Sequence, residues 1–326
     1  PEKFSDDSLR EIKTFENDLE NTPFSGAFRT LFTWRNWALG GVVMAALLGL
    51  GTMGYSGMRS AGLGPWGSLQ AKGILDSDER LIVADFQDHT GDGTLGETVT
   101  ALFHIDLSQS RSVVLLDRAQ LSQALVRMER GPSDPITHDV ALELAQREGV
   151  KGVVLGEVLP LGPGAVVSVR LVSASTGEDL SVLRETARTI DAVPNAVDRL
   201  SAQLRGRIGE SFRSIQADPP LERVTTASIE ALRKYVQAEW AADMGDLSTA
   251  RALVEEAIAE DSTFAMAYRM LGVLLSNDGG VGSEAKEAFT KAYEWRARLT
   301  TRERLLAEAA YYTYVTEDVD VAIRAY

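Results

Sequence analysis

Residues 81–125 read LIVADFQDHTGDGTLGETVTALFHIDLSQSRSVVLLDRAQLSQAL. The stretch opens with an apolar run, Leu81–Phe86, which is typical of a buried strand, and continues into an amphipathic helix over Gly96–Ser108. A second apolar strand, Val113–Asp117, is followed by a helix over Arg118–Arg130. Because strands alternate with helices, the stretch predicts a domain of the α/β or α+β class.

The chain keeps this character up to residue 218. The further expected elements are a helix over His138–Glu148, strands over Val150–Val158, Ala165–Ser173 and Ser181–Thr189, and a long helix over Val193–Gln216. The three strands follow one another without an intervening helix, which predicts a terminal meander. We therefore expect an α/β (α+β) sandwich over residues 78–218, in which a small sheet carries helices on one face.

Several motifs of this domain resemble the TolB amino-terminal-like, or CsgG/FlgO-like, family of bacterial envelope domains. They are a strand that ends at Phe86, the loop Thr90-Gly91-Asp92, the strand Val113–Asp117, the run VKGVVLGEV at Val150–Val158 and the turn STGE at Ser175–Glu178. The resemblance implies the fold of that family. It also implies a domain that carries no catalytic motif, because domains of this family bind partners or have unassigned roles.

A glycine-rich loop follows the first strand. Gly91, Gly93 and Gly96 have the GxGxxG spacing of dinucleotide-binding loops, and Asp117 ends the next strand. However, the glycines begin five residues after Phe86, and the acidic side chains of the loop would repel a pyrophosphate. The favoured interpretation is a structural glycine turn, and dinucleotide binding is the alternative.

The same loop is rich in side chains that could bind a metal ion. These are Asp85, Asp88, His89, Asp92 and Glu97. Their spacing does not match a calcium loop, so a solvated acidic loop is favoured over a bound cation. Three histidines and no cysteine offer little material for nucleophilic or general-base catalysis. We predict no catalytic residue, no cofactor-binding residue, no metal ligand and no enzyme activity.

A stretch without charge lies between Arg35 and Arg59 and reads NWALGGVVMAALLGLGTMGYSGM over Asn36–Met58. As a helix it would measure about 34 Å, enough to cross the hydrocarbon core of a bilayer, which is ~30 Å thick. We therefore predict a single-pass membrane protein. An amphipathic tail over residues 1–35 would precede the transmembrane helix, and a linker over 59–77 would follow it.

Two sets of residues have expected roles in this segment. Small residues that recur every four positions predict a helix-packing face, made of Gly41, Ala45 and Gly49. Aromatic residues near the ends predict membrane-interface positions, namely Trp34, Trp37 and Tyr55.

From residue 219 to residue 326 the strand signal disappears and alanine-rich segments recur. Ala250, Ala285 and Ala322 are spaced by 35 and 37 residues, like the second-helix alanines of tetratricopeptide repeats. Small residues at such positions let paired helices pack closely. We predict an all-α, tetratricopeptide-like helical repeat domain. Its possible partner surface is Tyr311, Tyr312 and Tyr314, although these rings could instead pack between helices with their hydroxyls in water.

Composition and domain organisation together suggest a function. The net charge of -14 argues against a nucleic-acid partner, because phosphate binding needs clustered Lys and Arg. We expect a non-catalytic, membrane-anchored scaffold or accessory subunit that stabilises a multi-subunit membrane complex. It would lie in the bacterial inner membrane, with a cytoplasmic N-terminus and the bulk of the chain periplasmic. The alternative is an envelope sensor with a ligand- or protein-binding extracytoplasmic domain.

The predicted partners are other membrane-protein subunits and the lipid bilayer, without a cofactor. The whole arrangement also resembles auxiliary single-helix subunits of bacterial photosynthetic reaction-centre–antenna complexes. That resemblance implies reaction-centre or antenna polypeptides and their pigments as partners.

Overall fold

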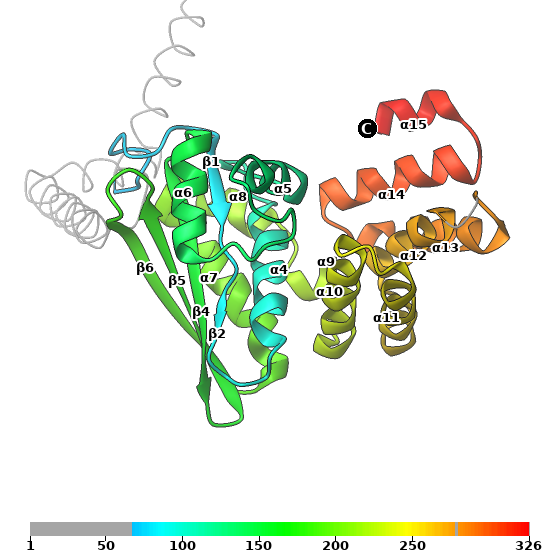
Figure 1. The fold of residues 1–326 in the computed structure, drawn as a ribbon, viewed down its shortest axis with the longest axis horizontal. Helices are drawn as coiled ribbons and strands as arrows, with labels where there is room; N and C mark the ends of the chain where they lie inside the picture. The colour runs from blue at the N-terminus through cyan, green and yellow to red at the C-terminus, as the bar shows by residue number, and fades with distance from the viewer. Residues whose placement is uncertain (1–66, 278–279, 326) are drawn as a thin grey trace, which may run out of the picture. The chain divides into compact units, whose positions relative to one another are not determined.

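The computed structural model describes residues 67–277 and 280–325, which belong to one compact unit, Gly62–Tyr326. These residues form an α/β domain followed by a series of helices (Figure 1). The expected α/β domain and the helices that follow it are thus both present in the described part of the chain.

The predicted class of single-pass membrane protein is corrected by this architecture. Within residues 67–277 and 280–325, no helix has both the length and the apolar character needed to cross a bilayer. The longest described helix, α7 (Val193–Ile208), has 16 residues, which is about 24 Å against a core of ~30 Å. The predicted span Asn36–Met58 lies outside the described residues. We retain the class of an α/β domain followed by helices, without the transmembrane helix or the inner-membrane location.

One mixed sheet organises the α/β domain. Its strands are β1 (Glu79–Val83), β2 (Gln87–Asp88), β3 (Val113–Leu115), β4 (Gly152–Leu161), β5 (Gly164–Ser173) and β6 (Asp179–Ala187). The order across the sheet is β3-β1-β4-β5-β6, and β2 also pairs with β4. Strand β1 is parallel to β3 and β4, whereas β4, β5 and β6 form the expected antiparallel meander.

Helices α4 (Leu95–Leu107) and α7 cover one face of the sheet. Phe103 of α4 and Leu200 and Leu204 of α7 are fully buried against the strands. On this face the ring of Phe86 fills the space beside Gly156, where an added Cβ would lie 2.2 Å from the ring. Close packing therefore requires glycine at this point of β4.

Helices α5 (Arg118–Arg127) and α6 (His138–Glu148) cover part of the opposite face. Leu125 and Leu144 pack there against Ile82 of β1 and Val153 of β4 in a second buried cluster. The expectation of helices on only one face was therefore wrong. The sequence carried a sign of this, because parallel strands that are buried on both faces have nearly continuous apolar runs.

The predicted long helix Val193–Gln216 is two helices. α7 ends at Ile208, because Gly209 adopts a φ of 145°, a backbone conformation that residues other than glycine rarely adopt. The short helix α8 (Phe212–Ala217) then begins after Ser211, whose side chain accepts a hydrogen bond from the backbone N–H of Ser214.

The segment before β1 lies beside the end of α7. The backbone N–H groups of Leu69 and Gln70 donate to the carbonyl oxygens of Arg207 and Ile208, both at 3.0 Å. The first described residues and the last turn of α7 are therefore held together, although they are far apart in the sequence.

A buried ionic network lies where α7 gives way to α8. The guanidinium of Arg205 donates to both carboxylate oxygens of Glu210, at 2.9 and 2.8 Å, and also pairs with Asp218. The side chains of Arg205 and Glu210 are each only 2 % exposed. The hydroxyls of Ser110 and Ser214 add hydrogen bonds to Glu210 at 2.6 and 2.7 Å. The network thus joins the residues after α4 to those after α7.

The rest of the described chain is helical. The helices are α9 (Leu221–Val224), α10 (Ile229–Asp243), α11 (Leu247–Glu260), α12 (Ala265–Asn277), α13 (Ser283–Glu294), α14 (Thr301–Tyr314) and α15 (Val319–Ala325). They pack in successive pairs, α10 with α11, α12 with α13 and α14 with α15 (Figure 1).

Small residues bring these helices close together. An added Cβ on Gly272 of α12 would lie 2.6 Å from the ring of Phe289 of α13. On its other side the Phe289 ring stacks on Tyr314 of α14, with 5.0 Å between the ring centroids. The buried residues of α10 and α12 are continuous with the core formed by α4 and α7.

Candidate functional site

The glycine-rich loop serves as a cap for α4. The carboxylate of Asp88 accepts hydrogen bonds from the backbone N–H of Thr90 at 2.8 Å, from its hydroxyl at 2.6 Å and from the N–H of Gly96 at 3.0 Å. Burial alone would raise the pKa of Asp88, but these hydrogen bonds outweigh it, and the net shift is downward. A negative charge of the chain itself therefore lies at the N-terminus of α4.

The glycines of the loop have steric functions. Gly91 and Gly93 both adopt a φ of 79°, in the left-handed region. An added Cβ on Gly96 would lie 2.8 Å from the carbonyl oxygen of Phe86, so glycine lets α4 begin close to the strand. In a dinucleotide-binding loop, the pyrophosphate would occupy the place that Asp88 fills here. This geometry supports the structural turn over dinucleotide binding.

The possible metal ligands of the loop point to different partners. A carboxylate oxygen of Asp85 accepts from the N–H of Ile136 at 2.8 Å, and Asp92 pairs with Arg233 of α10 at 2.7 Å. Within residues 67–277 and 280–325, no group of three His, Asp or Glu side chains could hold a metal ion. The loop instead contacts two neighbouring parts of the chain.

Replacing Asp88 by alanine is expected to lower the free energy of unfolding by about 1–2 kcal/mol, because the N-terminus of α4 loses its charged acceptor. Urea denaturation monitored by circular dichroism measures the change. Asp88→Asn retains an acceptor oxygen and is expected to lose less. Equal losses for the two variants would contradict a role of the negative charge.

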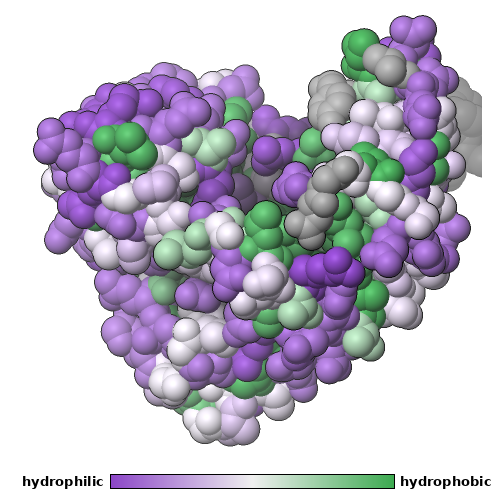
Figure 2. All heavy atoms as spheres, turned by 45° about the vertical axis from the view of Figure 1, so that its right-hand side comes forward, coloured by the Kyte–Doolittle hydropathy of each residue, from purple (hydrophilic) through white to green (hydrophobic). Residues whose placement is uncertain are grey.

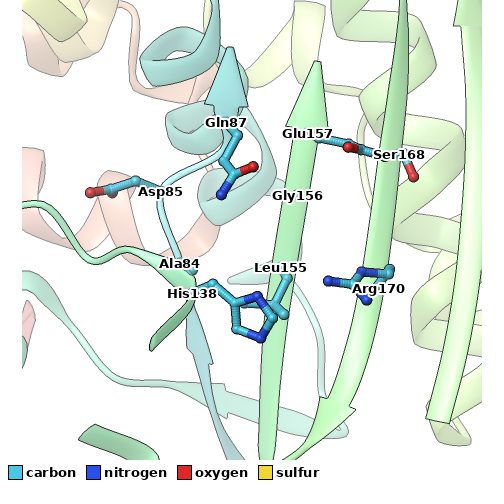
Figure 3. A pocket seen from close by; sticks show the side chains of 9 residues that line it. All are labelled: Ala84, Asp85, Gln87, His138, Leu155, Gly156, Glu157, Ser168 and Arg170. Carbon is cyan, nitrogen blue, oxygen red and sulfur yellow. The ribbon is translucent and has the colours of Figure 1, made fainter. Parts of the chain in front are cut away.

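A depression opens on the sheet face that α6 covers only in part. It encloses about 420 Å³, including the solvent at its mouth. Its lining comes from the loop after β1, from β2, from the first residue of α6 and from β4 and β5 (Figure 3), namely Ala84, Asp85, Gln87, His138, Leu155, Gly156, Glu157, Ser168 and Arg170.

Strand register brings the polar side chains of the depression together. Leu155 is paired with Arg170, and Glu157 with Ser168, so the four side chains lie on the same face of adjacent strands. His138 and Leu155 both line the depression, whereas the side chain of Asp85 points away from it in Figure 3. The loop contact of Asp85 with Ile136 explains this direction.

The depression offers the carboxylate of Glu157, the guanidinium of Arg170, the imidazole of His138 and the neutral polar side chains of Gln87 and Ser168. Arg170 is already hydrogen-bonded to Asp179 at 3.3 Å. Sites for small molecules are mostly apolar and enclose most of their ligand, whereas this depression is polar and open. Its chemistry therefore fits polar side chains of a protein partner. The sequence analysis did not identify the polar residues of this depression, although the alternation of polar and apolar residues in β4 and β5 was a signal for them.

Beyond the depression, the outer half of this sheet face lacks a helical cover in the described chain. Apolar side chains are exposed on it, with Leu161 at 48 % and Val182 at 58 %. Strand β6 is also an edge of the sheet. Exposed apolar side chains next to an edge strand are typical of protein-binding surfaces. We call this area, from the depression to β6, the open sheet face.

The predicted tyrosine surface lies on α14. The ring of Tyr311 stacks on Tyr293 with 4.1 Å between the centroids, and the hydroxyl oxygens of Tyr312 and Tyr293 are 3.1 Å apart. Tyr314 covers Phe289 and is 36 % exposed. The rings thus pack between helices, as the alternative interpretation expected, and their role as a partner surface stays a prediction.

The other predicted site residues lie outside the described residues. They are the helix-packing residues Gly41, Ala45 and Gly49 and the interface residues Trp34, Trp37 and Tyr55.

Comparison with known proteins identifies no family: no family model matches this chain, and no curated protein matches it. Similar solved structures include the C-terminal domain of LpoB from Salmonella enterica. It is 20% identical, with a TM-score of 0.33, and the match covers 37% of this chain and 90% of that one.

Two further similar structures also come from bacteria. Lipoprotein GNA1162 from Neisseria meningitidis is 16% identical, with a TM-score of 0.29, over 33% of this chain and 79% of that one. TolB from Acinetobacter baumannii is 12% identical, with a TM-score of 0.27, over 44% of this chain and 30% of that one. A TolB is thus among the similar structures, but at such low identities and TM-scores the similarities do not assign a function.

Proposed function

We propose that this protein is a non-catalytic accessory protein that binds partner proteins through its open sheet face. The observation that carries the proposal is the combination of exposed Leu161 and Val182 with the polar depression around Glu157 and Arg170. Val182 is in register with Arg170, beside the depression, and Leu161 lies six residues beyond Leu155 along β4. A mixture of exposed apolar and polar side chains is the usual composition of a non-obligate protein interface.

The helical part fits the same function. Its successive helix pairs, with Gly272 against Phe289, support the hypothesis of a tetratricopeptide-like stack over residues 219–326, following an envelope-type domain over 78–218. Such stacks use their extended inner faces to bind other proteins. The finer hypothesis, a photosynthetic reaction-centre–antenna complex as the partner assembly, rests on the sequence resemblance alone.

Replacing Val182 by glutamate is expected to abolish co-purification of the partner, because it replaces an exposed apolar side chain of the open sheet face by a charge. The measurement is gentle affinity purification of the full chain from its native cells, followed by size-exclusion chromatography and mass spectrometry. If the partners are reaction-centre or antenna polypeptides, their pigments are expected to co-elute.

Val126→Glu is the matched control. Val126 lies on α5 and is 55 % exposed, close to the 58 % of Val182. Retention of a stoichiometric complex by Val182→Glu would contradict the proposed surface. A wild-type chain that elutes as a monomer and is stabilised by a small ligand would favour the sensor alternative.

A further inference from the structure

Strand β6 is the longer of the two edges of the sheet. It has nine residues, whereas the opposite edge, β3, has three. Within residues 67–277 and 280–325, no backbone group bonds to the outer side of β6. An edge strand of this length presents a row of backbone donors and acceptors to which a further strand can add.

The strand register shows which residues of β6 direct their backbone groups outward. The backbone N–H of Ser173 donates to the carbonyl oxygen of Glu178 at 2.9 Å, across the turn between β5 and β6. Successive residues of an antiparallel strand bond alternately to its two sides, so every second residue of β5, counted back from Ser173, bonds toward β6. The partners of these residues in β6 are Ser181, Leu183, Glu185 and Ala187. The residues between them, Val182, Arg184 and Thr186, therefore direct their N–H and C=O groups outward.

The same three residues expose their side chains on the open sheet face. Val182 is in register with Arg170 of the depression, and Arg184 is in register with Ser168. A strand added to β6 would place every second side chain beside Val182, Arg184 or Thr186. The added strand would thus extend the open sheet face by one row of side chains.

The ion pairs of β6 leave one of its charges without a partner. Its two carboxylates are both paired, Asp179 with Arg170 at 3.3 Å and Glu185 with Arg199 of α7 at 2.8 Å. Arg184 is exposed and forms no ion pair in the part of the chain that the structure describes. The one cation of β6 is therefore available to an acidic side chain from outside.

The other charged residues around Arg184 do not neutralise it. Glu157 lies in the same cross-strand row but two strands away, about 10 Å across the sheet. Beyond the end of β6, Arg188 and Asp191 of the short helix η1 (Ile190–Ala192) are both exposed and contribute one charge of each sign. The surroundings of Arg184 thus favour an anionic neighbour, although the whole chain has a net charge of -14.

The helical part of the protein offers no such row of backbone groups. Figure 2 brings the helical side of the molecule forward and shows hydrophobic residues among hydrophilic ones. The N–H and C=O groups of a helix bond within the helix itself, so a partner finds mainly side chains there. An extended segment can form a backbone ladder at β6 but not on this side.

We infer that β6 accepts an extended segment of a partner protein as an additional strand, with an acidic side chain beside Arg184 and an apolar one beside Val182. The outward backbone groups of β6 would hold the segment in place. The charge of Arg184 would fix its register, because a shift by two residues moves the carboxylate away from the guanidinium. The inference rests on the proposed protein-binding function and names the form and the chemistry of the partner segment.

The first test uses three fluorescein-labelled peptides, whose binding to the full chain is measured by fluorescence anisotropy. The first is Thr-Val-Thr-Glu-Thr-Val-Thr, the second has lysine in place of glutamate, and the third is the first peptide with every backbone nitrogen methylated. The acidic peptide is expected to bind, and the lysine peptide to bind about tenfold more weakly. The methylated peptide is expected not to bind, because it keeps the side chains but has no backbone donors.

Charge reversal at Arg184 tests the same point from the side of the protein. Arg184→Glu is expected to make the lysine peptide the tighter ligand. Arg213→Glu is the matched control, because Arg213 is an exposed arginine of α8 and the change of charge is the same. Equal peptide preferences in the two variants, no binding of the acidic peptide, or undiminished binding of the methylated one would overturn the inference.

A proline in β6 tests strand addition in the native complex. Thr186→Pro removes an outward N–H but no hydrogen bond to β5, so circular dichroism is expected to show an intact fold. The variant is expected to lose the co-purifying partner, whereas Thr186→Ala, which keeps the N–H, is expected to retain it. If the full chain alone forms a dimer that Thr186→Pro dissociates, a second copy occupies β6 and the inference is overturned.

The outcomes for Val182 and Thr186 separate this inference from the proposed function. If Val182→Glu abolishes the native complex and Thr186→Pro leaves it intact, the partner lies on the open sheet face without adding a strand. Only the inference then fails. A complex that survives Val182→Glu would instead contradict the proposed function itself.

Discussion

Replacing Arg205 by alanine is expected to lower the free energy of unfolding by about 3–5 kcal/mol. The guanidinium is buried and holds both oxygens of Glu210 as well as the carboxylate of Asp218. Its removal leaves two carboxylates in a place that water hardly reaches. An uncompensated buried charge costs far more than the ion pair contributes when it is intact.

Urea denaturation of the full chain measures this loss, and Arg199→Ala is the control. Arg199 belongs to the same helix and pairs with Glu185 at 2.8 Å, but its side chain is 50 % exposed. An exposed pair contributes about 0–1 kcal/mol, so the control is expected to change stability little. Similar losses in the two variants would show that burial of the Arg205 network has no special importance.

The same network predicts an acid-dependent loss of stability. Burial alone would raise the pKa of Glu210, but the hydrogen bonds from Arg205, Ser110 and Ser214 lower it to about 2. Because the folded-state pKa lies below the unfolded one, this stability is fully present above about pH 4.5 and is lost as the pH falls toward 2. In Arg205→Ala the corresponding part of the acid dependence is expected to be missing.

Replacing Phe289 by alanine is expected to cost about 3–5 kcal/mol. The ring is fully buried, contacts Gly272 on α12 and stacks on Tyr314 of α14. Alanine would leave a cavity between three helices, and Gly272 has no side chain that could fill it. The measurement is again urea denaturation, followed by the helical signal in circular dichroism.

Phe212 provides the matched control, because it is 74 % exposed. Phe212→Ala is expected to change stability by no more than about 0.5 kcal/mol. If Phe289→Ala changed the free energy of unfolding as little as Phe212→Ala, the close packing of α12, α13 and α14 around this ring would be refuted.

Most strands and helices of the α/β domain could be predicted from hydrophobic patterning. The helix His138–Glu148 was predicted with its observed bounds, and the predicted strand Ala165–Ser173 differs from β5 by one residue. These elements have clear local signals, either helical spacing or continuous apolar runs. The break at Gly209 was missed, because a glycine near a helix end does not by itself reveal its φ.

Contacts between distant residues could not be predicted in this way. The buried partners Arg205 and Asp218 appear as ordinary charged residues in the sequence, and the contact of Ser110 with Glu210 spans 100 residues. The depression likewise depends on the register that pairs Leu155 with Arg170. The acidic residues of the glycine loop already argued against dinucleotide binding. That Asp88 caps α4 became visible only from its hydrogen bond with the N–H of Gly96.

The two hydrogen bonds from Leu69 and Gln70 to the end of α7 have a mechanical consequence. They fasten the first described residues to the last turn of the helix that closes the α/β domain. A pulling force applied between these two points would act on the two hydrogen bonds and not on the strands of the sheet.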